Sequence, residues 1–117
     1  MEYINVITPV HKFDESVKGF LAKAINSYDE ASKFLKEKKD ELGTKLTIVC
    51  PERLMADIDS FISDIEWSNK CSVLCNNSGK IDFCSQINFA VENIQERYFS
   101  ILECDDEYYE KWFWQFS

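Results

Sequence analysis

Strand-like and helix-like segments alternate four times along this chain, and this alternation is the strongest constraint on its fold. The strand-like runs are apolar and rich in β-branched residues, and they cover residues 4–10, 45–50, 72–74 and 98–103. Between them, apolar residues recur at helical spacing over residues 17–25, 28–42, 54–67 and 82–96. This order predicts an α/β fold with a mainly parallel sheet of about four strands and right-handed crossovers.

Proline, glycine and capping residues mark where these elements should begin and end. Pro9 is expected to end the first strand and Pro51 the second, because proline cannot donate to the ladder of a central strand. Asp14 or Ser16 can cap the first helix, and Gly43 is placed to end the helical stretch that follows. Phe20 falls on the apolar side of the first of these helices, over residues 17–25, and is expected to face inward.

The fourth strand-like run ends abruptly in carboxylates, since residues 98–107 read YFSILECDDE. We expect a buried strand, with Ile101 in the core, that projects Glu103 and Asp105 to one side before Asp106 begins a turn. Carboxylates this close repel one another unless a cation lies among them, and Mg²⁺ or Mn²⁺ prefers such oxygen ligands. A metal site is therefore one interpretation, and a solvated acidic loop after a core strand is the other.

The carboxyl ends of parallel strands meet at one edge of a sheet, and ligands bind beyond that edge. The residues expected there are Pro9, Val10, His11, Cys50, Pro51, Glu52, the turn of residues 76–79 and the acidic residues 103–106. Backbone N–H groups of the turn can face phosphate oxygens while the carboxylates hold a bridging cation. A nucleoside diphosphate fits this arrangement.

Length and charge narrow the class of protein. With 117 residues and 45% hydrophobic content, residues 1–117 fit a single domain with its own core. A net charge of −8 argues against nucleic acid as a partner. No apolar run is long enough to span a membrane, and the amino terminus lacks a secretory signal, so we expect a soluble, cytoplasmic protein. The five cysteines form an odd set in or beside apolar segments, which favours reduced thiols over disulfides or a zinc site.

Two blocks of the sequence resemble the family 2 glycosyltransferases, which have the Rossmann-like, three-layer GT-A fold. The opening VITPV resembles the family's first strand, and NNSGKIDFCSQINFAVENIQERYFSILECDDE resembles the block that runs into the family's DxD motif. The resemblance implies a nucleotide-diphospho-sugar as ligand, for example a UDP-sugar, and Mn²⁺ or Mg²⁺ as cofactor. It implies metal contacts from Asp105 and Asp106, and nucleotide-sugar contacts from Pro9, Val10, His11, Asn77, Gly79, Asn88 and Glu103.

The sequence departs from the family pattern at several positions. Glu103 stands where the first Asp of DxD is usual, Gln86 stands where a basic residue is common, and Cys50 with Pro51 replaces an acidic pair. The resemblance covers only the amino-terminal, nucleotide-sugar-binding half of the family's catalytic domain, so the fold is expected to be truncated. The acceptor site and the general base belong to the other half, and no catalytic base can be named in this chain.

The last ten residues carry six aromatic side chains, which are Tyr108, Tyr109, Trp112, Phe113, Trp114 and Phe116. A helix docked on the sheet edge would cover them, and so would an interface with a second copy or another protein. We expect self-association or a protein partner, because a short helix cannot turn all of these side chains toward its own sheet.

Two functions of different classes follow from these observations. One is a glycosyltransferase-like domain that binds a nucleotide-diphospho-sugar through a metal. The other is a non-catalytic protein derived from the same fold that serves in a larger assembly, for example a virus particle. A third alternative is a fragment of a longer enzyme. Fold alone does not choose between them.

Overall fold

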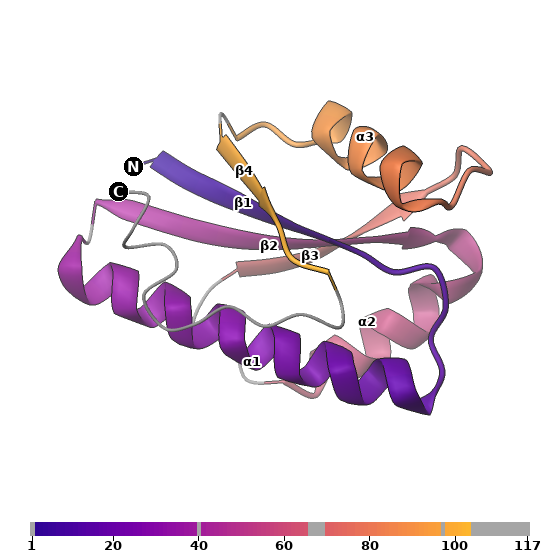
Figure 1. Ribbon diagram of the computed structural model, residues 1–117, viewed down its shortest axis with the longest axis horizontal. Coiled ribbons are helices and arrows are strands. Elements are labelled where there is room, and N and C mark those ends of the chain that lie inside the picture. The colour runs from indigo at the N-terminus through magenta and orange to yellow at the C-terminus, as the bar shows by residue number, and fades with distance from the viewer. Residues whose placement is uncertain (1, 40, 66–69, 97, 104–117) are drawn as a thin grey trace.

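The computed structural model describes residues 2–39, 41–65, 70–96 and 98–103, which form four strands and the helices between them (Figure 1). The elements in chain order are β1 (Glu2–Pro9), α1 (Glu15–Lys38), β2 (Leu42–Pro51), the 3₁₀ helix η1 (Glu52–Leu54), α2 (Met55–Ser63), β3 (Lys70–Asn76), α3 (Phe83–Asn93) and β4 (Tyr98–Ile101). The predicted alternation of strands and helices is confirmed, and β1 and β2 end at Pro9 and Pro51 as expected.

The four strands form one sheet in the order β3-β2-β1-β4, and every pair is parallel. Val6 is paired with Leu46 of β2 and with Ser100 of β4, which makes β1 and β2 the central strands. The predicted fold class, an α/β layer around a parallel sheet, is therefore confirmed.

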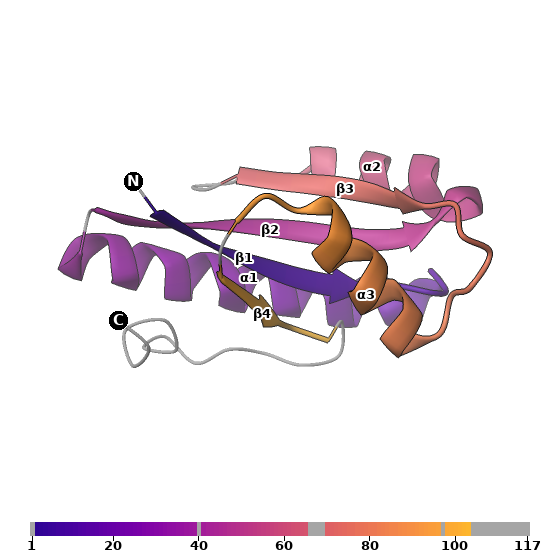
Figure 2. The same ribbon diagram turned by 90° about the horizontal axis from the view of Figure 1, so that it is seen from above.

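The helices cover both faces of the sheet, giving three layers (Figures 1 and 2). The chain steps from β1 to β2 to β3 in one direction, so crossovers of one hand place α1 and α2 on the same face. It then returns across the sheet to β4, which places α3 on the opposite face. Because all four strands are parallel, their carboxyl ends lie at the same edge of the sheet.

Two core clusters fill the spaces on either side of the sheet. The larger cluster lies on the side of α1 and α2 and includes Val6, Leu21, Leu46, Ile48 and Ile58. The smaller cluster lies under α3 and consists of Ile7, Val49, Ile87 and Ala90. Val6 and Ile7 are neighbours in β1 and enter different clusters because side chains alternate along a strand. This alternation explains why β1 and β2 carry apolar residues on both faces.

Helix α1 is one continuous helix of 24 residues, longer than either predicted segment. Its cap is Asp14, whose side chain accepts a hydrogen bond of 2.9 Å from the backbone N–H of Val17. The helix ends at Lys38 and not at Gly43, which lies inside β2. A Cβ at position 43 would lie 2.5 Å from a ring carbon of Tyr3, so the close approach of the Tyr3 ring explains this glycine.

The buried middle of α1 is joined to β2 through hydroxyl groups. The Tyr28 hydroxyl and Thr44 Oγ1 are 3.0 Å apart, and Ser32 Oγ also hydrogen-bonds Thr44 Oγ1. Burial raises the pKa of Tyr28 to about 12, which keeps its hydroxyl protonated. Phe20 was expected to face inward on this helix, but it is 49% exposed near the helix start.

Strand β4 differs from the buried strand that its sequence suggests. Ile101 is 38% exposed, and Tyr98 and Phe99 are 50% and 46% exposed. The physical reason is the sheet order, because within the described part of the chain β4 pairs with β1 alone and lies at the edge. The expectation that Ile101 lies in the core is therefore wrong.

None of the described helices is long and apolar enough to cross a membrane. Cys50, Cys71, Cys75 and Cys84 are unbridged, and Cys104 lies outside the described residues. Burial raises the pKa of Cys50 to about 11 and that of Cys71 to about 12, so both thiols stay protonated. Cys50 belongs to the larger core cluster, and Cys71 is partly buried against it.

Candidate functional site

A cavity of about 700 Å³ opens at the edge of the sheet where the strands end, and we call it the carboxyl-edge cavity. This volume lies within the range of small-molecule sites, about 300–1,000 Å³. Its walls come from the end of β1, the β1–α1 loop, the β3–α3 loop, the first turns of α1 and α3, and the segment after β4. They consist of Pro9, His11, Lys12, Asp14, Ser16, Val17, Phe20, Ile81, Asp82, Phe83, Gln86 and Glu103.

Three of the residues predicted to bind a nucleotide-sugar meet in this cavity. Pro9 lines it from the end of β1, His11 from the β1–α1 loop, and Glu103 from the segment after β4. Val10 is 1% exposed, and its N–H donates a hydrogen bond of 2.8 Å to the Val49 carbonyl, which attaches the start of the loop to β2. The His11 carbonyl accepts a hydrogen bond of 2.9 Å from Arg53 Nη2.

The remaining predicted residues of the described chain do not line the cavity. Asn77 and Gly79 are exposed in the turn after β3, where Gly79 has a φ of +83°. The backbone N–H groups of Ser78 and Lys80 in this turn donate to side-chain oxygens of the turn itself. Asn88 is exposed on α3.

The predicted metal ligands Asp105 and Asp106 lie outside the described residues, as do the aromatic residues of the carboxyl-terminal segment. In the part of the chain that the structure describes, no group of three His, Cys, Asp or Glu side chains is arranged to hold a metal ion. Glu103 is the first residue of the acidic run and lines the cavity, and it is the last residue that the structure describes.

Two carboxylates in the cavity wall are already engaged as helix caps. Asp14 caps α1, and Asp82 caps α3 by accepting hydrogen bonds from Ser85 N at 3.1 Å and Ser85 Oγ at 2.7 Å. These two hydrogen bonds lower the pKa of the Asp82 carboxyl. Each of the two helices therefore begins at the cavity with an aspartate cap that accepts a hydrogen bond from one backbone N–H group of the first turn.

Nine of the twelve residues that line the cavity were not predicted as site residues, and three of them, Gln86, Phe20 and Phe83, bear on what the cavity can bind. Gln86 is 1% exposed, although glutamine is mostly exposed in proteins. Its position among Phe83, Ile87 and Ala90 on the inward side of the predicted helix was the available signal. Phe20 and Phe83 gave no such signal, because aromatic residues at helical spacing usually belong to a core.

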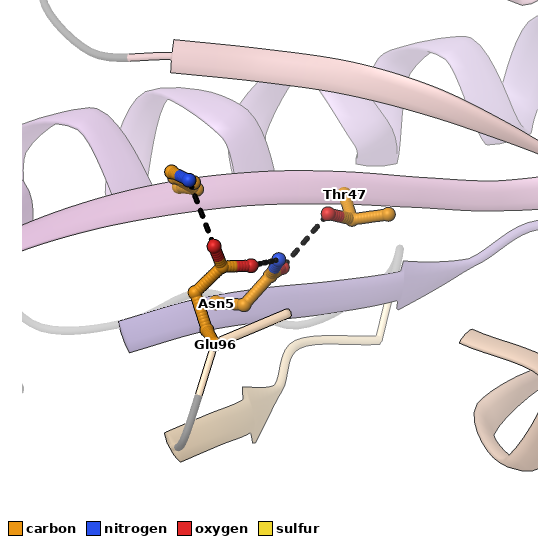
Figure 3. A network of polar contacts seen from close by, with 4 residues as sticks. Asn5, Thr47 and Glu96 are labelled. Carbon is orange, nitrogen blue, oxygen red and sulfur yellow. Dashed lines mark hydrogen bonds and ion pairs between the residues drawn. The ribbon is translucent and has the colours of Figure 1, made fainter. Parts of the chain in front are cut away.

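A second hollow, of about 370 Å³, lies on the α3 side of the sheet, where the chain leaves α3. Glu96 is the centre of a polar network in its wall (Figure 3): Oε1 accepts a hydrogen bond of 2.7 Å from Asn5 Nδ2, and Oε2 lies 2.7 Å from Lys45 Nζ. Thr47 Oγ1 donates to Asn5 Oδ1 at 2.8 Å. The network ties the segment before β4 to β1 and β2, so its role is structural.

Glu96→Gln should lower the free energy of unfolding at pH 7 by about 1–3 kcal/mol, because it removes the charged acceptor of two hydrogen bonds. The hydrogen bonds from Lys45 and Asn5 lower the pKa of Glu96 in the folded protein. The stability from this carboxylate is therefore present above its unfolded pKa and is lost as the pH falls through the folded pKa. Urea unfolding at neutral and acidic pH should show the difference from the parent protein shrinking in acid. The exposed Glu92→Gln serves as the control, and a difference that stays constant with pH would argue against this account.

The comparisons with known proteins bear on the fold. No protein-family model and no curated protein sequence matches this chain. Among solved structures, the fold is similar to two crystal structures of the S. aureus glycosyltransferase TarS. For TarS 1-349 the TM-score is 0.56 with 17% identity, over 95% of this chain and 29% of that chain. For the second TarS structure the TM-score is 0.54 with 17% identity, over 95% of this chain and 18% of that chain.

At this identity the likeness concerns the fold alone. The chain has a glycosyltransferase-like Rossmann fold, and it spans 29% and 18% of the lengths of the two chains that it matches. The fold expected from the resemblance to GT-A enzymes is supported at this coarser level.

Proposed function

We propose that this chain is a glycosyltransferase-like domain that binds a nucleotide-diphospho-sugar through a divalent cation. The observation that carries the proposal is the carboxyl-edge cavity, which lies where ligands bind in open parallel sheets. Glu103 lines this cavity, and Asp105 and Asp106 follow it two and three positions later in the sequence. The likeness of the fold to the glycosyltransferase TarS supports a glycosyltransferase-like domain.

The charges around the cavity support a cation as part of the ligand. Its wall contains the carboxyl groups of Asp14, Asp82 and Glu103 and the ammonium group of Lys12, so acidic groups outnumber basic ones and a diphosphate entering alone would meet net electrostatic repulsion. Asp14 and Asp82 accept hydrogen bonds as helix caps. In the proposed site, carboxylate oxygens of Glu103, Asp105 and Asp106 would coordinate Mn²⁺ or Mg²⁺. The ion would neutralise the diphosphate, as in other phosphate-transfer sites. Pro9, His11 and Gln86 would shape the part of the site that receives the nucleoside.

Isothermal titration with UDP tests this proposal. In the presence of Mn²⁺ we expect saturable binding, and in EDTA we expect the affinity to fall by at least about tenfold, because the repulsion between carboxylates and diphosphate is no longer bridged. UMP provides a control, since its single phosphate should depend less on the cation. Equal affinity for UDP in Mn²⁺ and in EDTA would contradict the proposed site.

The second candidate function is that of a non-catalytic module in a larger assembly. The observation that favours it is the exposed apolar surface of the edge strand β4, where Tyr98, Phe99 and Ile101 are each at least 38% exposed. Exposed apolar patches of this kind are common at protein interfaces. Absence of UDP binding in both Mn²⁺ and EDTA would favour this function over the first.

A further inference from the structure

Gln86 has an unusual environment for a glutamine. It lies in the first turns of α3, is 1% exposed, and lines the carboxyl-edge cavity. Its Nε2 donates a hydrogen bond of 3.1 Å to the carbonyl of Val10, which lies 76 positions earlier in the chain. Its Oε1 is buried and has no hydrogen-bond partner among the described residues.

The hydrogen bond to Val10 fixes the orientation of the amide group. A flipped amide would place Oε1 against the Val10 carbonyl oxygen, and two acceptors cannot share a hydrogen bond. Buried side-chain oxygens almost always have a partner, and leaving one unpaired costs a protein stability. Gln86 therefore lines the cavity and also carries a buried acceptor that has no partner among the described residues. A donor group of a bound ligand would satisfy this acceptor.

The neighbouring walls indicate what kind of group that ligand presents. Phe20 from α1 and Phe83 from α3 line the same cavity and are 49% and 44% exposed, so the cavity offers flat apolar surface beside the polar atom. A deprotonated diphosphate has only acceptor oxygens and cannot donate to Gln86 Oε1. A nucleoside has flat ring surface together with N–H and O–H donors, and stacking on aromatic side chains favours it.

We propose that Gln86 is a specificity-determining residue whose Oε1 accepts a hydrogen bond from an N–H or O–H group of the nucleoside part of the ligand, beside Phe20 and Phe83. This inference rests on the proposed function and deepens it. The diphosphate and its cation then lie toward the acidic residues, away from the Gln86 oxygen.

Gln86→Met tests the inference, because methionine keeps the length of the side chain and removes the acceptor. The parent protein and the variant are both titrated in Mn²⁺ with two probes. The first is whichever of UDP, CDP, ADP and GDP binds the parent protein most tightly, and the second is inorganic pyrophosphate. We expect the affinity for the nucleotide to fall by about 5-fold to 150-fold, as for the loss of a buried hydrogen bond. The affinity for pyrophosphate should not change.

Thr8→Val is the matched control. Thr8 is 1% exposed and its Oγ1 is also buried without a partner among the described residues, but Thr8 does not line the cavity. Removing this oxygen should leave nucleotide affinity unchanged. Equal nucleotide affinity for the parent protein and Gln86→Met would overturn the inference, and so would an equal loss of pyrophosphate affinity, which would make Gln86 a purely structural residue.

Analogues of the same nucleotide identify the donor and do not depend on the variant folding. One set of analogues is methylated at each base nitrogen that carries hydrogen, with both hydrogens replaced at an exocyclic amino group, and others lack the 2′ or the 3′ hydroxyl. With the parent protein, one of these analogues should bind about 5-fold to 150-fold more weakly, and equal affinity for all of them would sink the inference. A parent protein that binds pyrophosphate but no nucleotide would overturn it while leaving the metal site standing, whereas binding of neither probe would overturn the proposed function itself.

Discussion

Ile48→Ala should lower the free energy of unfolding by about 2–5 kcal/mol, as large-to-small substitutions in a packed core do. Ile48 is fully buried in the central strand β2 and belongs to the core cluster on the side of α1 and α2. The loss has two parts, the transfer of the removed methyl groups and the cavity left among side chains that can relax only partly. Urea unfolding followed by circular dichroism measures it.

Ile101→Ala is the matched comparison, because it removes the same atoms from a strand of the same sheet. Ile101 is 38% exposed in the edge strand β4, so less apolar surface is lost from the interior. We expect a cost below about 1.5 kcal/mol. Equal costs for the two variants would mean that β4 is covered as fully as β2, which the edge position of the strand does not predict.

The contrast between Ile48 and Ile101 also shows which features of the fold the sequence pattern could predict. Residues 4–10 and 45–50 are apolar at successive positions, which happens when both faces of a strand are covered. The structure places them in β1 and β2 at the centre of the sheet, where alternate residues such as Val6 and Ile7 enter different core clusters. Periodicity therefore identified the strands and helices and the parallel sheet.

The same pattern could not place a strand within the sheet. The run YFSI of β4 is as apolar as that of a central strand, yet its position is decided by the return of the chain across the sheet after α3. Likewise, Gly43 is a plausible helix end in the sequence, and only the packing of the Tyr3 ring explains why glycine stands there. Both corrections concern contacts between segments that are distant in the sequence.

The candidate site was predictable in part for the same reason. The edge where the strands end follows from a parallel sheet, and Pro9, His11 and Glu103 do meet there. The burial of Gln86 could be inferred from its position on the inward side of the predicted helix. The cavity that Gln86 and Phe20 line could not be predicted, because it forms only where the first turns of α1 and α3 come together. Asn77, Gly79 and Asn88 lie apart from this cavity.

Asp105→Asn should abolish the cation-dependent binding of UDP. Loss of a residue that hydrogen-bonds a metal ligand typically costs about 10-fold to 100-fold in metal affinity. Asp105 is a direct ligand in the proposed site, so its removal should cost more than about a hundredfold. Stability should change little, because removing one of several neighbouring carboxylates relieves repulsion in the absence of the cation. Titration of UDP in Mn²⁺ and urea unfolding of the same variant measure the two quantities separately.

Asp64→Asn provides the control for charge, since Asp64 is exposed at the end of α2 and does not line the carboxyl-edge cavity. It removes the same unit of negative charge from the protein and should leave UDP affinity unchanged. A similar loss in both variants would assign the effect to net charge, and unfolding of Asp105→Asn would assign Asp105 a structural role. A loss of binding confined to Asp105→Asn, with unfolding unchanged, is the outcome that separates a cation ligand from an ordinary surface carboxylate, because only a ligand couples UDP affinity to the metal.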